Sequence, residues 1–342
     1  MPLPRLSVIM ASYNGAAYVG AAVRSILSQT FGDFELVIAD DGSRAETVAI
    51  LQRFALGDSR IRVILGEHQG QIATLNRALA ACRGALLARL DHDDIAQPSR
   101  FAQQVAYLDA HADCVMVGTR TCFIDSAGND VGGADEARAM RTLRHAPLAF
   151  PPRVPFVHGS TPMMRTDVFR SVGGFRAEFT AAEDRDVSWR MAACGRVARL
   201  GEPLVKHRLH DSNLSKTGRR TQILSHFFSD LSAAATALGL DDAAARRCIE
   251  VGGDFKPALD AYRTLLHRSY PVDTYWQFHL ARERGWEIAG FASGADFMRE
   301  VGRRLLGNPV DARRWRTLFK ARKSVLKAGT NVRAADASAV VP

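Results

Sequence analysis

Short apolar runs alternate with segments of helical periodicity along the first hundred residues. The apolar runs predict strands, and the segments between them place apolar residues three and four positions apart, as in amphipathic helices. The predicted strands are residues 6–10, 35–39, 61–65 and 85–90, and two of the predicted helices are residues 16–29 and 72–82. Such alternation is typical of βαβ units, so the sequence predicts an α/β fold with a mostly parallel central sheet.

The segment after the second predicted strand carries a helix-start signal. Ser43-Arg44-Ala45-Glu46 fits the S-x-x-E capping box. In that motif the serine side chain accepts from the amide of the glutamate, and the glutamate side chain accepts from the amide of the serine. The motif therefore predicts a helix that starts at this point.

Beyond residue 98 the pattern becomes less regular and then wholly helical. It predicts a helix from Ser99 to about His111, a strand at 114–124, short helices at 166–172 and 185–194, and a strand near 204–209. From about residue 221 the chain is rich in Ala, Leu and Arg without strand alternation. We therefore expect an α/β domain over residues 1–217, a helical domain over 218–333 and a disordered end over 334–342.

Composition narrows the class of protein. Of the 342 residues, 47% are hydrophobic and 24% charged, which is the balance of a folded globular chain. No apolar run approaches the roughly 20 residues of a membrane-spanning helix, and no signal-peptide pattern opens the chain. The five cysteines lack C-x-x-C spacing, which argues against a disulfide framework or a thiolate zinc site. We expect a cytoplasmic protein.

The net charge of +9 is concentrated in one terminal segment. Ten cations and the single anion Asp311 lie between Val301 and Arg333, and the rest of the chain is balanced. Because a nucleic-acid-binding enzyme spreads its cations around a groove, no nucleic-acid partner is expected. Trp315 and Phe319 fall on the apolar arc of a basic amphipathic helix. Such a helix suits the cytoplasmic face of an anionic membrane, and the alternative is packing on protein.

Acidic residues follow two of the predicted strands. Asp40 and Asp41 end the second strand, and Asp91 and Asp93 follow the fourth. Ligands of open α/β sheets bind beyond the carboxyl ends of the strands, so these acids are expected to converge on one crevice. The D-x-D pair fits a Mg²⁺ or Mn²⁺ site, because such ions are commonly held by one or two carboxylates and substrate phosphates. The alternative is a solvated acidic turn.

Several motifs occur together, in a fixed order, over roughly residues 5–215. They are Ser7–Asn14, Val37–Ser43, Leu90–Asp94, Pro98–Phe101 with Val115–Thr119, Gly173–Arg176, Glu183-Asp184 and His207–His210. In this combination the chain resembles family 2 glycosyltransferases of the GT-A fold. The resemblance implies a nucleotide-binding α/β sandwich followed by a helical C-terminal region. The chain departs from the common pattern at residues 70–77 and at His92, where a small residue is frequent.

The resemblance assigns donor-binding roles to residues at the strand ends. It implies that Asp40 bonds the base of a nucleotide-sugar and that Asp91 serves the ribose. Ser12 and Asn14, which end the first strand, would meet the base or ribose. The alternatives are a turn residue for Asp40 and a helix N-cap for Asn14.

The resemblance also implies a metal and a base. Asp93 would ligate Mg²⁺ or Mn²⁺, and His210 would be a further metal or diphosphate contact. Asp184 would be the general base that takes the proton of the acceptor hydroxyl. The alternatives are an ordinary strand histidine for His210 and, for Glu183-Asp184, anions that complement a helix dipole.

The implied function is a metal-dependent, inverting glycosyltransferase of the hexosyltransferase type. It would move a sugar from a nucleotide-sugar, with UDP the expected nucleotide, to a carbohydrate or lipid-linked acceptor in cell-surface glycan synthesis. A sugar-phosphate nucleotidyltransferase is a rival, although its glycine-rich loop after the first strand is absent. A non-catalytic glycan- or membrane-binding relative is a second rival. The intact acids Asp91, Asp93 and Asp184 argue against it.

Overall fold

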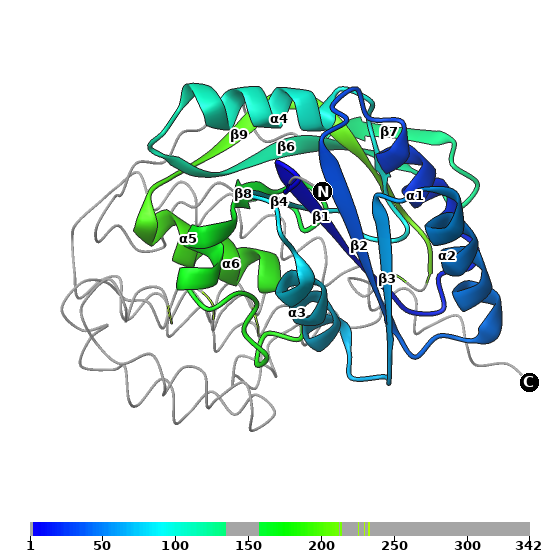
Figure 1. Cartoon of the computed structure of the whole chain (residues 1–342). Helices are drawn as coiled ribbons and strands as arrows, with labels where there is room; N and C mark the ends of the chain where they lie inside the picture. Colours follow the sequence, from blue (N-terminus) through cyan, green and yellow to red (C-terminus); the bar gives the residue numbers. More distant parts are fainter. Residues whose placement is uncertain are drawn as a thin grey trace, which may run out of the picture. The chain divides into compact units, whose positions relative to one another are not determined.

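The computed structural model describes residues 3–134, 157–211 and 213, together with Ser225, Ser229 and Ser232 (Figure 1). The boundary at residue 217, the helical domain over 218–333 apart from those three serines, the basic segment and the end over 334–342 lie outside the described residues. No helix among the described residues is long and apolar enough to cross a membrane.

Strands and helices alternate from β1 to β4, as the apolar pattern predicts. The elements are β1 (Leu6–Ser12), α1 (Val19–Leu27), β2 (Phe34–Asp41), α2 (Ala45–Gly57), β3 (Ile61–Gly66), α3 (Gln71–Ala81), β4 (Leu86–Arg89), β5 (Ile95–Ala96), α4 (Arg100–Ala110), β6 (Cys114–Ile124), β7 (Asp130–Ala134), β8 (Met163–Arg165), α5 (Thr166–Ser171), α6 (Glu183–Cys194) and β9 (Arg196–Arg208).

One sheet organises these elements, in the order β3-β2-β1-β4-β8-β6-β9-β5, with β7 paired to β6. The first four strands of this order are parallel to one another. β8 is antiparallel to both β4 and β6, and β6 and β9 are again parallel. The predicted α/β class with a mostly parallel sheet is confirmed.

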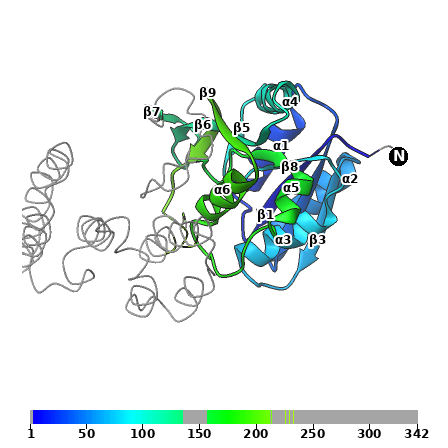
Figure 2. The same ribbon diagram turned by 90° about the vertical axis from the view of Figure 1, so that its left-hand side faces the viewer.

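Helices cover both faces of the sheet, as Figures 1 and 2 show. Side chains of α1, α2 and α4, such as Ile26, Leu51 and Phe101, pack with one face of the strands in a first core. Side chains of α3, α5 and α6, such as Leu75 and Phe169, pack with the other face in a second core. Because successive strand residues point to opposite faces, the parallel strands are apolar on both sides and read as continuous hydrophobic runs.

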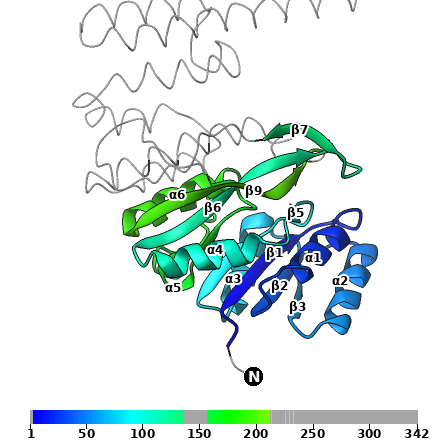
Figure 3. The ribbon, with the colours of Figure 1, turned by 90° about the horizontal axis from the view of Figure 1, so that it is seen from above.

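The long strands β6 and β9 run side by side, and β7 lies along one end of β6 (Figure 3). The β6–β9 register shifts at irregularities between Cys114 and Met116 and between Gly118 and Thr121. β5, in the turn after β4, pairs with β9 through Ile95 and Lys206. β9 therefore brings its C-terminal end next to the acidic turn that follows β4.

The predicted capping box is wrong. The N-cap of α2 is Arg44, without a side-chain capping bond, and α2 begins at Ala45. The Ser43 hydroxyl instead accepts from the backbone N–H of Asn14 at 2.8 Å. A contact between two turns that are distant in sequence has replaced the local bond.

Candidate active site

Two buried polar side chains lie side by side where β1 and β2 end. Ser12 and Asp40 are partners in the β1–β2 register and are each 1% exposed. One carboxylate oxygen of Asp40 accepts from the backbone N–H of Ser43 at 2.9 Å. The other, Oδ1, and the hydroxyl of Ser12 have no partner among the described residues. A buried polar atom without a hydrogen bond costs about 1–3 kcal/mol, so this pair is suited to a polar ligand.

Asn14 links the turns after β1 and β2. Its side-chain oxygen accepts from the Arg44 amide at 3.0 Å, and its own amide donates to the Ser43 hydroxyl. Its φ of 48° lies in the left-handed region, which asparagine tolerates better than most residues. The N-cap of α1 is Tyr18, so the N-cap alternative for Asn14 is wrong. Asn14 fixes the shape of the strand-end rim.

Asp41, the next residue of β2, anchors α3. Its carboxylate accepts from the backbone N–H groups of Gln69 and Gly70 at 2.8 and 3.0 Å and from the Thr74 hydroxyl at 2.8 Å. Burial works to raise the pKa of Asp41, but these donors outweigh it and the pKa lies below its ordinary value. Both carboxylate oxygens of Asp41 thus have hydrogen-bond partners within the protein, whereas Asp40 Oδ1 has none among the described residues.

Asp91, in the turn after β4, is held by Arg89, the last residue of that strand. Arg89 Nε donates to Asp91 Oδ1 at 2.8 Å, and the Asp91 amide donates to the Ser160 hydroxyl at 3.2 Å. Burial works to raise the pKa of Asp91, but the charge and hydrogen bonds of Arg89, with a smaller contribution from His158, together keep the pKa below its ordinary value. Asp91 is therefore an anion in a fixed orientation.

Asp93 meets His210 across the sheet edge. The carboxylate of Asp93 and the Nε2 atom of His210 are 2.9 Å apart, and their side chains are 16% and 11% exposed. The Tyr18 ring stacks on His210 with centroids 5.0 Å apart, and the Arg208 guanidinium lies over that ring at 4.8 Å. Burial and the charge of Asp94 raise the pKa of Asp93. A cation would relieve this crowding of negative charge. Mn²⁺ takes both a carboxylate oxygen and an imidazole nitrogen as ligands, whereas Mg²⁺ would be held through the carboxylate oxygen.

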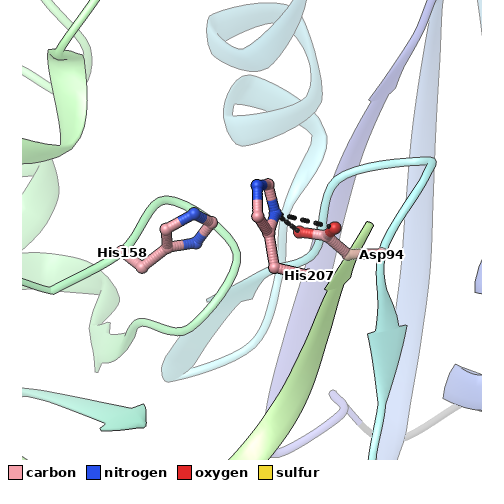
Figure 4. A group of neighbouring side chains, drawn as sticks. All are labelled: Asp94, His158 and His207. Carbon is pink, nitrogen blue, oxygen red and sulfur yellow. Dashed lines mark hydrogen bonds and ion pairs between the residues drawn. The ribbon is translucent and has the colours of Figure 1, made fainter. Parts of the chain in front are cut away.

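A second group of acidic and histidine side chains includes Asp94, the residue that follows Asp93. Donor atoms of Asp94, His158 and His207 lie within 4.8 Å of one another (Figure 4). His207 Nδ1 is 3.0 Å from Asp94 Oδ1, and that oxygen also accepts from the Arg208 amide at 2.9 Å. Burial lowers the pKa of His158 to about 4. Burial works to raise the pKa of Asp94, but the hydrogen bonds and charge of His207, with smaller contributions from His158 and Ser160, together outweigh it and lower this pKa to about 2. The pair ties β9 to the acidic turn and so sets His210 opposite Asp93.

His92 packs into space that a glycine leaves. A Cβ atom on Gly15 would lie 2.5 Å from the His92 ring, and His92 Nδ1 is 3.2 Å from the Ala11 carbonyl oxygen. The unusual histidine between the two acids is therefore accommodated by the turn after β1. The acids on either side of it keep their contacts.

Asp184 is the second residue of α6. Its carboxylate accepts from the Arg185 amide at 2.8 Å. Burial and the adjacent carboxylate of Glu183 raise the pKa of Asp184 to about 7, against the opposing charge of Arg89. Asp186, by contrast, is buried between Arg176 and Arg190 and serves the packing of α6. Asp184 has the proton affinity of a group that exchanges a proton near neutral pH.

The sequence did not predict several residues that complete the site. Arg89 was signalled only as the one charged side chain in an otherwise apolar predicted strand. His158 and Tyr18 carried no signal, because their partners His207 and His210 lie far along the chain. Pairing of β9 with β6 and β5 brings these segments together.

Known proteins share this fold and sequence pattern. Residues 7–173 match the family described as Glycosyl transferase family 2. The chain is 31% identical over 222 residues to the O-antigen biosynthesis glycosyltransferase WbnJ of Escherichia coli, covering 63% of this chain and 84% of WbnJ. It is 29% identical over 229 residues to an uncharacterized glycosyltransferase of Haemophilus influenzae, covering 64% of this chain and 70% of that protein.

Among solved structures, the chain is similar to S. aureus TarS 1–349, with a TM-score of 0.56 at 18% identity over 83% of this chain and 89% of that one. The same TarS region in complex with UDP-GlcNAc gives a TM-score of 0.55 at 17% identity, over 83% of this chain and 89% of that one. The fold is the GT-A fold. The chain belongs to glycosyl transferase family 2.

Proposed function

We propose that this glycosyltransferase is a metal-dependent, inverting enzyme that transfers a hexose from a UDP-sugar. The observation that supports the choice of donor is the pair of oxygens on Ser12 and Asp40 that have no partner among the described residues. A carboxylate oxygen accepts from an N–H, and a hydroxyl can donate to a carbonyl. The edge of uracil presents both groups, and TarS, which shares the fold, has been crystallised with UDP.

Asp91 would then face the ribose, with its carboxylate oriented by Arg89. Asp93 and His210 are the residues that would hold Mg²⁺ or Mn²⁺. When bound, such an ion supplies positive charge that stabilises the diphosphate leaving group.

Asp184 is proposed to take the proton of the acceptor hydroxyl. The freed oxygen forms a bond to the anomeric carbon while the bond from that carbon to the UDP oxygen breaks. A single displacement of this kind inverts the anomeric configuration. A pKa near 7 suits the task, because the carboxylate form is populated at neutral pH while its affinity for a proton stays high.

The acceptor is proposed to be a carbohydrate or lipid-linked glycan of the cell surface. The name of the relative WbnJ places that protein in O-antigen biosynthesis. A cytoplasmic catalytic unit whose basic C-terminal segment contacts the membrane surface would meet such an acceptor.

The test is a screen of UDP-sugars, beginning with UDP-GlcNAc, for UDP release in Mn²⁺ or Mg²⁺. Asp184→Asn should keep calorimetric UDP binding while turnover falls by about 10²- to 10⁴-fold, as for the loss of a general base. Asp167→Asn makes the same change at an exposed position in the first turn of α5 and should leave both unchanged.

Two results would contradict the proposal. Absence of UDP binding together with absence of turnover of any nucleotide-sugar would remove the glycosyltransferase assignment. Release of pyrophosphate from UTP and a sugar phosphate would instead identify a nucleotidyltransferase.

A further inference from the structure

Arg89 is a buried cation at the end of a central strand. It is the last residue of β4, and its side chain is 3% exposed. Side chains alternate along a strand, so Arg89 points to the same face as Leu87. That face packs with α3, α5 and α6 in the second core. A charge in such a place is costly to bury unless it is fully paired.

Two carboxylates from opposite sides of the site pair with this one guanidinium. Its Nε and NH2 atoms donate to Asp91 at 2.8 and 3.3 Å. Its NH1 atom donates to Glu183, the first residue of α6, at 2.7 Å. The planar fork of arginine offers separate N–H groups to the two acids, which the single ammonium of lysine does not.

The surroundings hold the guanidinium in one position. A Cβ atom on Gly159 would lie 3.3–3.5 Å from its atoms, so the glycine leaves the space that they need. The Phe175 ring lies 5.8 Å from the guanidinium carbon. The carbonyl oxygen of Arg89 accepts from buried Arg100 at 2.8 Å, which fixes the backbone beneath it.

The helix that carries Asp184 begins at a strained point. Ala182 precedes α6 with a φ of 58°, in the left-handed region, where alanine is disfavoured. As the N-cap residue of α6, Ala182 has no side chain that could bond the first turn. The Arg89–Glu183 ion pair is therefore a contact that fixes where this helix starts relative to β4.

We propose that Arg89 is a positioning residue that sets the base Asp184 and the donor-side acid Asp91 in one geometry by pairing with Glu183 and Asp91 together. This inference rests on the proposed roles of Asp91 and Asp184. Arg89 acts through its two partners.

Among the described residues, the charges that shift the pKa of Asp184 most come from three segments. They are Glu183 on α6, Arg89 at the end of β4 and Asp91 in the turn after β4. Removal of the positive charge should raise the pKa of Asp184, and removal of the Glu183 charge should lower it. If Arg89 and Glu183 only supported packing, their substitutions would not be expected to shift the pKa of Asp184 in opposite directions.

Three single variants, Arg89→Lys, Arg89→Met and Glu183→Gln, and one double variant test the inference. Glu183→Gln should lower kcat by about 10- to 100-fold, the effect of slight misplacement of a catalytic group. Its Kd for UDP with Mn²⁺ should stay within about twofold of the parent. Arg89→Lys should lower kcat as much and also weaken UDP binding through Asp91. The double variant Arg89→Lys/Glu183→Gln should lose no more kcat than Arg89→Lys, because both changes break one link.

The pH dependence is the readout that a packing role would not change. The acidic limb of kcat/KM should move to higher pH in Arg89→Met and to lower pH in Glu183→Gln. Arg83→Lys is the matched control, because Arg83 pairs with buried Glu35 at 2.8 Å at the opposite ends of the strands. It should leave kcat, KM and the pH limb as in the parent.

The proposed function and the role of Arg89 can fail separately. If the parent binds no UDP and turns over no UDP-sugar, the function fails. The coupling is then judged from the Asp184 carboxyl resonance in ¹³C-labelled protein, assigned by its loss in Asp184→Asn. Opposite pKa shifts in Arg89→Met and Glu183→Gln would support the coupling. Unmoved titrations, or additive losses of kcat in an active enzyme, would overturn it.

Discussion

Individual residues of this site differ in whether their polar atoms have hydrogen-bond partners within the described part of the protein. Asp41 accepts from two backbone amides just before α3 and from the Thr74 hydroxyl within it, whereas adjacent Asp40 keeps one oxygen free of partners among the described residues. The D-D-G-S sequence presents both acids alike. Only the direction of each side chain, set by the alternation of β2, separates the structural acid from the candidate ligand-binding acid.

The pH dependence of turnover follows from Asp184. Its carboxyl must be ionised to accept a proton, and its pKa is raised to about 7. We expect kcat/KM for the UDP-sugar to rise about tenfold per pH unit below pH 7 and to level off above it. The measurement is UDP release at low donor concentration between pH 5 and 9. A kcat/KM that stays level down to pH 5 would show that Asp184 is not the group whose ionisation limits the reaction.

Two neighbouring groups of acids and histidines could each bind a metal ion, and substitutions can show which of them does. If the ion binds Asp93 and His210, then Asp93→Ala and His210→Ala should abolish the stimulation of UDP binding by Mn²⁺. His158→Phe should keep that stimulation, because His158 belongs to the second group, with Asp94 and His207. Calorimetry with and without Mn²⁺ decides. Loss of the Mn²⁺ effect in His158→Phe alone would move the metal to the second group.

At the scale of elements, strands β1 to β4 and the helices between them could be predicted because each has its own periodicity. β5, β7 and β8 could not. β5 and β8 have two and three residues, and β7 is rich in glycine, so these strands exist only because β9, β6 and β4 offer them backbone partners. The capping box failed for a similar reason, since Asn14 competes for Ser43.

The turn between α5 and α6 depends on two glycines with different surroundings. Gly173 and Gly174 have φ values of 89° and 65°. A Cβ atom on Gly174 would lie 3.0 Å from Leu79 and 3.2 Å from Asn76, whereas one on Gly173 would meet nothing within 4 Å. Gly173→Ala should cost about 1–2 kcal/mol of unfolding free energy from backbone strain alone. Gly174→Ala should cost about 1–3 kcal/mol more from overpacking.

Urea unfolding measures this difference. The two variants share the same change and the same region of backbone conformation, so each is the other's control. Equal losses of stability would show that Leu79 and Asn76 yield without cost.

At the scale of the whole molecule, the predicted basic amphipathic segment needs its own test. We expect the full chain to co-sediment with anionic vesicles at low salt, because each cation near the surface contributes about 1 kcal/mol. Lys320→Glu/Lys323→Glu/Lys327→Glu should abolish that binding. Arg44→Glu/Arg53→Glu/Arg60→Glu, placed around α2 of the catalytic unit, is the control for charge. Binding that persists in the first variant, or none in the parent, would contradict a membrane role.

The position of β9 in the chain has a consequence for how the protein is made. β9 pairs with β6 across some eighty residues, from Cys114 to Arg196, and β9 and the residues just after it supply His207, Arg208 and His210. Contacts between segments so far apart form slowly, because a long loop must close before they gain any stabilisation. A ribosome-bound chain that ends before β9 already contains β1 to β4 but lacks the groups opposite Asp93 and Asp94. During synthesis, we therefore expect the half of the site that is proposed to bind the nucleotide to form first, and the half that would hold the metal to form only when β9 leaves the ribosome.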